Sequence, residues 1–364
     1  VADGWETNTL VREDLKLGVD QQFGTQVGLS RVGSYLDKLR KAFRRTQQEP
    51  RNLSGVDAQL HQVFQRQREM FRYRLLDELV VDLLEYIERG GDLADPPSYI
   101  LVDEYQDLNP GELRLLQEIE GQHDSTVVAC GDDRQSIYGF RDAEPEGLHQ
   151  FPKIYDLEQV DYLWESWRCP QVVCDLAESI ADVLPKPASL DRPELMSWPE
   201  EEENTGMVRI LSHTHPNTEA RWVLRECRRL INEEDFDPSD IMIISAGFFD
   251  HVFRKLREQT EQVAELPFHL YDPRQRDPVG NEPAMRALGA GLRLLEDDQD
   301  QMAWRTLEWV MPGLGEVRRG NILEAGESTY LRSLVRAAED DAVCAQVVEA
   351  GQAVIDRFGE EDVV

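Results

Sequence analysis

The sequence has 364 residues and a formal net charge of −32, with 71 Asp and Glu against 39 Lys and Arg. This length suffices for two or three domains with separate cores, and no apolar run is long enough to span a membrane, which excludes an integral membrane protein. Lysine occurs only at positions 16, 38, 41, 153, 186 and 255. So strong an acidic excess favours a salt-rich cytosol, as in a halophilic archaeon, and an ordinary acidic protein is the alternative.

Helical patterns dominate the first part of the chain. Residues 1–27 have no clear period, and residues 31–74 are mostly helical and rich in arginine. Apolar residues from Leu76 to Ile87 recur at helical spacing and predict an amphipathic helix that Gly90 and Gly91 end. The arginines of residues 40–45 and 66–74 are candidates for binding phosphate. Arginines on a solvated helix face, paired with acidic neighbours, are the alternative and carry equal weight.

A strand, a helix and a second strand follow. Residues 99–102 are apolar, Asn109 and Pro110 are typical of a helix start, and residues 126–130 form a second apolar run. This order predicts a right-handed parallel crossover. The carboxyl ends of the two strands should therefore meet at one edge of a sheet, which is where open parallel sheets bind ligands.

The second half of the chain begins after a proline-rich and acidic stretch, residues 185–204, which predicts a domain boundary. Beyond it the pattern predicts strands at residues 207–211, 241–245 and 268–271, and helices at residues 218–231 and 249–259. The sequence from residue 284 onward is mostly helical and ends in an acidic run.

Polar side chains follow both strands of the predicted crossover. Asp103 and Glu104 come after the first strand, and Asp132 and Gln135 after the second. An acidic pair after a buried strand is a Walker-B-type arrangement, in which one carboxylate holds Mg²⁺ and the next accepts a proton from the attacking water. The pair alone is a weak signal, because acidic residues often begin loops. A metal-dependent hydrolase that uses Asp103, Asp132 and Asp133 is a further alternative.

Longer strings around these residues carry a family resemblance. D-E-Y-Q-D-L-N at residues 103–109 and G-D-D-R-Q-S-I-Y-G-F-R-D-A at residues 131–143 closely resemble motifs II and III of superfamily 1 DNA helicases of the UvrD/Rep/PcrA type. L-W-E-S-W-R-C-P-Q-V-V at residues 163–173 is similar to their motif IV. The resemblance implies a partial RecA-like, P-loop NTPase-type α/β domain with a parallel sheet and helical insertions, followed by part of a second RecA-like domain.

The resemblance also implies roles for residues in a nucleotide site that binds ATP and Mg²⁺. Asp103 would bind the metal, Glu104 would be the general base, and Gln106 and Gln135 would link the γ-phosphate to the DNA groove. A further pair comes from motif IV, where Arg168 would contact the γ-phosphate and Trp167 would stack on adenine. An aromatic core residue beside a surface arginine is the alternative for that pair.

A third set of residues would contact single-stranded DNA. Tyr138, Phe140 and Arg141 lie close together in the sequence, and aromatic side chains can stack on any base. Aromatic residues wedged between helices are the alternative. The family usually has glycine where this chain has Asp142, and we expect an added carboxylate to weaken phosphate binding there.

The resemblance covers only some of the motifs of a helicase motor. The sequence contains no Gly-Lys pair, so it lacks the Walker A loop that holds phosphates, and nothing after Tyr271 resembles the later motifs that supply an arginine finger. A finger alone is worth about 10³–10⁵ in rate, so we expect this polypeptide not to turn over ATP usefully. We interpret it as an internal segment of an ATP-dependent DNA helicase that moves 3′ to 5′. A non-catalytic DNA-binding or partner-docking remnant is the alternative.

The expected domain order is a helical accessory segment (residues 1–66), part of the first RecA-like domain (67–199), the start of the second (200–300) and another helical segment (301–364). The expected partners are single-stranded and duplex DNA, with no membrane. Five cysteines occur without a C-x-x-C pair, which favours reduced thiols and a cytoplasmic location.

Overall fold

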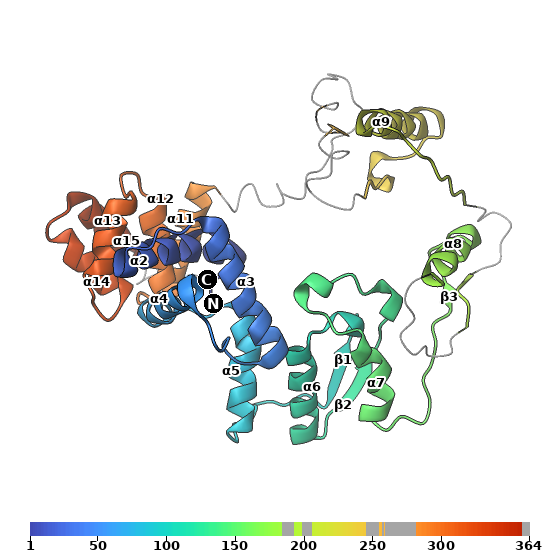
Figure 1. The fold of residues 1–364 in the computed structure, drawn as a ribbon, viewed down its shortest axis with the longest axis horizontal. Helices are drawn as coiled ribbons and strands as arrows, with labels where there is room; N and C mark the ends of the chain where they lie inside the picture. Colours follow the sequence, from blue (N-terminus) through green and yellow to red (C-terminus); the bar gives the residue numbers. More distant parts are fainter. Residues whose placement is uncertain (184–192, 199–205, 245–254, 257, 259–281, 359–364) are drawn as a thin grey trace. The chain divides into compact units, whose positions relative to one another are not determined.

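The structure is a computed structural model, and it describes residues 1–183, 193–198, 206–244, 255, 256, 258 and 282–358 (Figure 1). The chain divides into two compact units. Of the described residues, the first contains 1–162 and the C-terminal segment from residue 282, and the second contains those of Leu163–Leu184 and Pro193–Pro278. Each unit has its own apolar core. The fold class is mixed α/β with small parallel sheets, and the predicted domain boundaries stay predictions.

Helices from both ends of the chain share one core in the first unit (Figure 1). Leu15, Phe64, Trp304 and Tyr330 are buried in it, and the predicted helical character from residue 284 onward is confirmed. The helices are α1 (Gly4–Glu6), the π-helical η1 (Thr7–Val11), α2 (Arg12–Phe23), α3 (Leu29–Thr46), α4 (Gly55–Phe71), α5 (Leu76–Glu88), α11 (Pro283–Glu296), α12 (Gln301–Val310), α13 (Glu316–Glu324), α14 (Tyr330–Ala338) and α15 (Ala342–Phe358).

The sequence pattern does not predict α2, because a charged residue occupies one of its core positions. Asp14 is buried and accepts hydrogen bonds from Arg305 of α12, at 3.0 Å from Nε and 2.8 Å from Nη2. Arg305 is fully buried and also contacts Glu308. This network replaces an apolar contact by an ionic one, so the apolar period of the helix is incomplete.

The predicted crossover is present in the first unit. β1 (Tyr99–Val102) and β2 (Thr126–Ala129) pair in parallel, with Tyr99 opposite Thr126 and Val102 opposite Ala129. The connecting helix, α6 (Pro110–His123), begins at Asn109, whose side chain accepts from the amides of Gly111 and Glu112. Tyr105, Leu116 and Phe151 form the small core beneath this sheet. The short 3-10 helices η2 (Tyr105–Asp107), η3 (Asp133–Gln135) and η4 (Gly139–Arg141) follow the strands, and α7 (Glu146–Ile154) comes next.

The second unit contains β3 (Glu165–Ser166), α8 (Gln171–Ala181), β4 (Met196–Ser197), α9 (Pro216–Glu233) and the 3-10 helix η5 (Pro238–Asp240), and β3 pairs with β4 in parallel. The predicted helix at residues 218–231 is confirmed as α9. The predicted strands at residues 207–211 and 241–245 are wrong where described, because those residues do not pair with another strand. The predicted elements at residues 249–259 and 268–271 lie almost wholly outside the described residues. Among the helices that the structure describes, none combines the length and apolar character of a membrane span.

Candidate functional site

The loops that carry the predicted nucleotide residues lie at one edge of the β1–β2 sheet. Pairing continues past the strand ends, because Cys130 N donates to Val102 O at 2.8 Å and Tyr105 N donates to Cys130 O at 3.0 Å. The residues after each strand, from Asp103 and from Gly131, therefore start side by side. Cys130 itself is exposed, whereas the other four cysteines are partly or fully buried, and all five are free thiols.

The acidic pair occupies a strained turn. Asp103 and Glu104 are both exposed, and Glu104 N donates to Asp103 Oδ1 at 3.0 Å. Glu104 has φ 51°, in the left-handed region that side chains other than Asn, Asp and Gly rarely adopt. Strained residues of this kind cluster at active sites and ligand clamps.

Gln106 joins the two loops. Its side chain is 1% exposed, its Nε2 donates to Glu104 Oε2 at 2.7 Å, and its Oε1 accepts from Asp132 N at 3.0 Å. A Cβ on Gly131 would lie 2.6 Å from Gln106 Oε1, so a larger residue there would displace the Gln106 carboxamide. Because it is buried with both ends of its carboxamide bonded, Gln106 fixes the spacing between Glu104 and the second loop.

The hydrogen bonds continue from Asp132 to Gln135. Asp132 accepts from Arg134 N at 3.0 Å and from Gln135 Nε2 at 2.9 Å. A continuous chain of contacts thus runs from Glu104 through Gln106 and Asp132 to Gln135. The structure brings these residues to the same edge, and their chemical roles stay predictions.

Asp107 and His149 also contribute to this edge, although sequence reasoning gave them no role there. Burial and the negative charge of Glu104 raise the pKa of Asp107, against a smaller opposing effect of Arg141. His149 of α7 contacts Asp133, with 2.9 Å between Nε2 and Oδ2. The second aspartate of D-E-Y-Q-D was the available signal for Asp107, whereas nothing local in the sequence indicates His149.

The aromatic segment, residues Tyr138–Arg141, presents rings to solvent. Phe140 is 77% and Tyr138 36% exposed, their ring centroids are 5.7 Å apart, and the Arg141 guanidinium lies 5.7 Å from the centroid of the Tyr138 ring. An exposed pair of rings beside an arginine has the composition of a stacking site for nucleic-acid bases. The alternative of aromatic residues wedged between helices does not describe this segment.

Asp142 does not face solvent, which corrects the expectation that its carboxylate repels a phosphate backbone. It is 4% exposed and accepts hydrogen bonds from Arg44 and Arg45 of α3. Burial raises the pKa of Asp142, but the hydrogen bonds from Arg45 and Arg44 outweigh that effect and lower it below its ordinary value. The carboxylate is therefore held in its charged form by α3.

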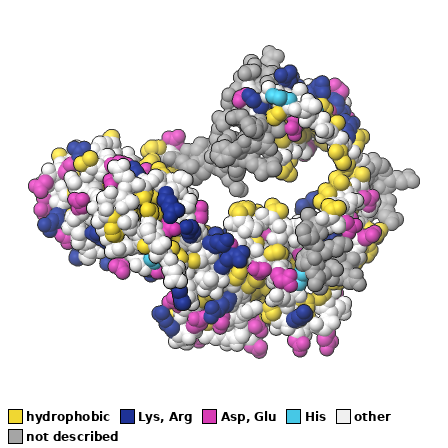
Figure 2. Space-filling view, viewed as in Figure 1, with side chains coloured by type: hydrophobic (Ala, Val, Ile, Leu, Met, Phe, Trp, Pro, Cys, Tyr) yellow, Lys and Arg dark blue, Asp and Glu magenta, His cyan; other side chains and the backbone are white. Residues whose placement is uncertain are grey.

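Several of the arginines that were candidates for binding phosphate form ion pairs with acidic side chains. Arg40 lies 3.7 Å from Asp37 and 3.8 Å from Asp77, and Arg44 lies 3.3 Å from Asp77. In the second cluster, Arg68 contacts both Glu49 and Glu78, and Arg74 contacts Asp82. Basic and acidic side chains are interspersed over the visible surface (Figure 2). The alternative of helix-face arginines paired with acids fits these contacts.

Trp167 and Arg168 lie in the second unit, between β3 and α8. Trp167 is exposed, with its ring centroid 5.9 Å from that of Trp198, and Arg168 is exposed as well. The exposure of both side chains leaves them accessible to a ligand. Their contact with a nucleotide stays a prediction.

The acidic edge suits a metal ion that arrives with a nucleotide. Mg²⁺ usually keeps several waters and is bound through one or two carboxylates plus substrate phosphates. Asp103 can supply one such carboxylate. The described residues contain no group of three His, Cys, Asp or Glu side chains placed to hold a metal, so the alternative of a three-carboxylate hydrolase gains no support.

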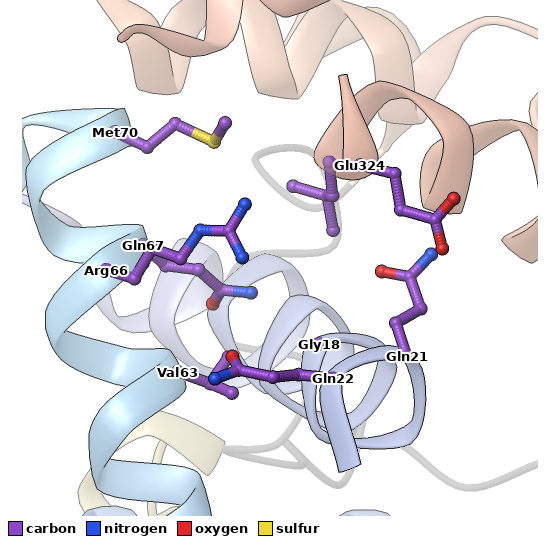
Figure 3. A pocket seen from close by; sticks show the side chains of 9 residues that line it. Gly18, Gln21, Gln22, Val63, Arg66, Gln67, Met70 and Glu324 are labelled. Carbon is purple, nitrogen blue, oxygen red and sulfur yellow. The ribbon is translucent and has the colours of Figure 1, made fainter. Parts of the chain in front are cut away.

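A separate cavity of about 230 Å³ lies among helices of the first unit (Figure 3). Side chains from α4 and α2 line it together with the end of α13, and several of them are amides, including Gln22 and Gln67. Gln67 donates to Asp14 O at 2.8 Å, which ties the cavity wall to the helical core. None of the predicted nucleotide or DNA residues lines this cavity.

The comparisons with known proteins agree with the motifs. Residues 29–156 match the UvrD/REP helicase N-terminal domain. The chain is 26% identical over 191 residues to the ATP-dependent DNA helicase srs2 of Schizosaccharomyces pombe, covering 51% of this chain and 20% of that protein. It is 27% identical over 158 residues to DNA helicase II of Rickettsia typhi, covering 43% and 23%. It is 27% identical over 131 residues to the ATP-dependent DNA helicase PcrA of Staphylococcus aureus, covering 35% and 18%.

These matches support the resemblance to UvrD-type helicases over the matched residues. The matched segment, residues 29–156, contains α3 to α7 and hence the acidic pair, Gln106, Gln135 and the aromatic segment. The aligned regions span about a fifth of the length of these relatives. The relatives are named as DNA helicases, two of them as ATP-dependent.

Proposed function

We propose that this chain is a portion of an ATP-dependent DNA helicase that moves 3′ to 5′ along one strand and separates duplex DNA. The observation that carries the proposal is the continuous chain of contacts from Glu104 to Gln135, which is followed within three residues by the exposed aromatic segment. A nucleotide-dependent change at the acidic edge would thereby reach residues suited to stack on bases. The resemblance to RecA-like motor domains supports the same conclusion.

In this proposal each residue of the edge has a distinct task. Asp103 binds Mg²⁺ on the nucleotide, and the metal neutralises charge on the phosphates. Glu104 accepts the proton of the attacking water, and Gln106 orients its carboxylate. Gln135 contacts the γ-phosphate and transmits its presence to the aromatic segment.

Two residues of the segment similar to motif IV also have tasks toward the nucleotide in this proposal. Arg168 contacts the γ-phosphate, where a planar and permanently charged guanidinium matches the phosphate oxygens. Trp167 stacks on the adenine ring. Both tasks rest on the similarity of residues 163–173 to motif IV.

Binding of a labelled oligothymidylate to the chain tests the DNA contact. Replacing Tyr138 by alanine should weaken binding by about 1–3 kcal/mol, the usual contribution of one stacked base. Phe358→Ala is the matched control, because Phe358 is also exposed and lies under a neighbouring arginine, Arg357, at 5.6 Å. Equal affinities for the wild type and Tyr138→Ala would remove the aromatic segment from the DNA path.

The alternative, a non-catalytic remnant, keeps the DNA contact but loses its link to the nucleotide. DNA affinity measured with and without ATP and Mg²⁺ separates the two functions in the complete protein. A change in affinity that requires Gln135 supports the helicase, whereas a constant affinity supports the remnant.

A further inference from the structure

A cluster of opposite charges joins the last turn of α3 to the end of the aromatic segment. We call Lys41, Arg44, Arg45 and Asp142 the α3 clamp. Asp142 Oδ2 lies 3.1 Å from Arg44 Nε, and Asp142 Oδ1 lies 2.7 Å from Arg45 Nε and 3.8 Å from Lys41 Nζ. The three basic residues are spaced i, i+3 and i+4, so they share one face of the helix. The buried carboxylate of Asp142 therefore lies close to three basic side chains on one face of α3.

The backbone at Asp142 closes the turn that carries the aromatic rings. Arg141 N donates to Tyr138 O at 2.8 Å, Asp142 N to Gly139 O at 3.1 Å and Ala143 N to Tyr138 O at 3.3 Å. Asp142 has φ 62°, a conformation that glycine adopts without strain and that aspartate tolerates at some cost. The contacts of its side chain with α3 offset that cost.

The end of α3 is itself fixed by two further elements. Arg44 Nη1 lies 3.3 Å from Asp77 of α5. A Cβ on Gly111, in the first turn of α6, would lie 3.2 Å from Arg44 O, so the two helix ends are in close contact. The helix that holds Asp142 is therefore also packed against the helix that follows the acidic pair.

We propose that Asp142 is a positioning residue that fixes the aromatic segment against α3 and so orients Tyr138 for stacking on a base of single-stranded DNA. This inference rests on the proposed DNA contact of the segment. A competing effect has the opposite sign, because loss of the carboxylate would free Arg44 and Arg45 to attract phosphate. The experiment has to separate orientation of the ring from release of the arginines.

Hydrogen–deuterium exchange of the chain without DNA measures orientation alone. Asp142→Gly removes the clamp and relieves the left-handed strain, but it also loosens the backbone, so the acceleration beyond that of a control glycine variant reports the lost side-chain contacts. Exchange of the amides of residues 141–143 should be about tenfold faster than in the wild type. Asp124→Gly is the control, since Asp124 is a left-handed and exposed aspartate at the end of α6. Unchanged exchange in Asp142→Gly overturns the proposal.

A double-mutant cycle between positions 138 and 142 then measures the effect on DNA binding. In the wild-type background, Tyr138→Ala should weaken oligothymidylate binding about tenfold. In the Asp142→Gly background, the same change should weaken it less than about threefold, because the ring is no longer oriented. If Tyr138→Ala weakens binding equally in both backgrounds, the proposal is overturned, whether or not Asp142→Gly itself raises the affinity for DNA. No loss in the wild type would refute the proposed DNA contact, and the exchange result alone would then decide whether Asp142 fixes the segment.

Discussion

Glu104 combines an exposed carboxylate with a strained backbone and a hydrogen bond from a buried carboxamide. Such a residue is held in one place while remaining accessible to water. In the complete motor protein that we propose, Glu104→Gln should slow ATP hydrolysis by about 10²–10⁴-fold, because the amide cannot accept a proton. Nucleotide affinity should stay unchanged, since Asp103 and the phosphate contacts remain. Single-turnover hydrolysis and equilibrium binding of a fluorescent ATP analogue measure the two quantities.

The matched control for this change is Glu118→Gln on α6, which makes the same substitution on a surface residue that lies 3.9 Å from Arg114. It should leave both quantities unchanged. If Glu104→Gln reduced binding and turnover in equal proportion, Glu104 would be a ligand of the nucleotide and another residue would have to serve as the base.

The lowered pKa of Asp142 leads to a prediction about how the stability of the fold depends on pH. Its folded pKa lies below its ordinary value of 3.8, so the folded state stabilises the charged form. A carboxyl with a lowered folded pKa contributes stability above its unfolded pKa, and this contribution is lost as pH falls through the folded value. Wild type should therefore be more stable than Asp142→Asn near neutral pH. Their free energies of unfolding should start to converge as pH falls below about 4, where the unfolded chain takes up the proton, and should meet once pH has fallen through the lower folded pKa of Asp142.

Urea unfolding of the two proteins at a series of pH values measures this convergence. Asp124→Asn is the control, because it makes the same substitution at an exposed aspartate at the end of α6. A stability difference between wild type and Asp142→Asn that stayed constant down to low pH would show that shape, and not charge, sets the role of Asp142.

At the scale of elements, Arg305 connects α12 to α2 through a fully buried guanidinium. Arg305→Met should destabilise the first unit by about 3–5 kcal/mol, because buried Asp14 would lose its cation and buried Glu308 would keep only the contact with Arg319. Lys16→Met is the comparison, since Lys16 of α2 pairs with Glu316 of α13 at 2.7 Å on the surface. The exposed pair should contribute about 0–1 kcal/mol. Chemical denaturation measures the loss of unfolding free energy in each variant. Similar small losses in Arg305→Met and Lys16→Met would show that the buried network is not needed for stability.

The helices and strands could be predicted where their signals are local. The period of Leu76–Ile87, the cap at Asn109 and the two apolar runs around α6 each place an element within a few residues of where it lies. Helix α2 could not be predicted, because Asp14 is neutralised by a residue 291 positions away. The predicted strand at residues 207–211 failed for the opposite reason: an apolar run becomes a strand only if another strand pairs with it.

For the molecule as a whole, the part of the predicted site that the structure brings together comes from one short stretch of sequence. Glu104, Gln106 and Gln135 lie within one crossover, so the parallel order of its strands was enough to place them at one edge. The burial of Asp142 and its contacts could not be predicted in the same way. Its partners, Arg44 and Arg45, come from a helix about a hundred residues earlier, and no local pattern pairs them.

The last prediction concerns ATP hydrolysis by the whole chain. We expect the 364-residue polypeptide on its own not to release phosphate from ATP, even with Mg²⁺ and single-stranded DNA, because its sequence has no Gly-Lys pair to hold the phosphates. A coupled phosphate-release assay measures this directly. DNA-stimulated release that disappears in Glu104→Gln would show instead that another part of the chain replaces the phosphate loop.

The thiol of Cys130 offers a practical way to watch the acidic edge. It is exposed at the end of β2, next to Gly131, while the remaining thiols are shielded to varying degrees. A maleimide dye should therefore react there first, one residue from the loop that Gln106 holds. If the acidic edge binds a nucleotide as we propose, emission from such a dye should change when the nucleotide is added, with no substitution in the protein.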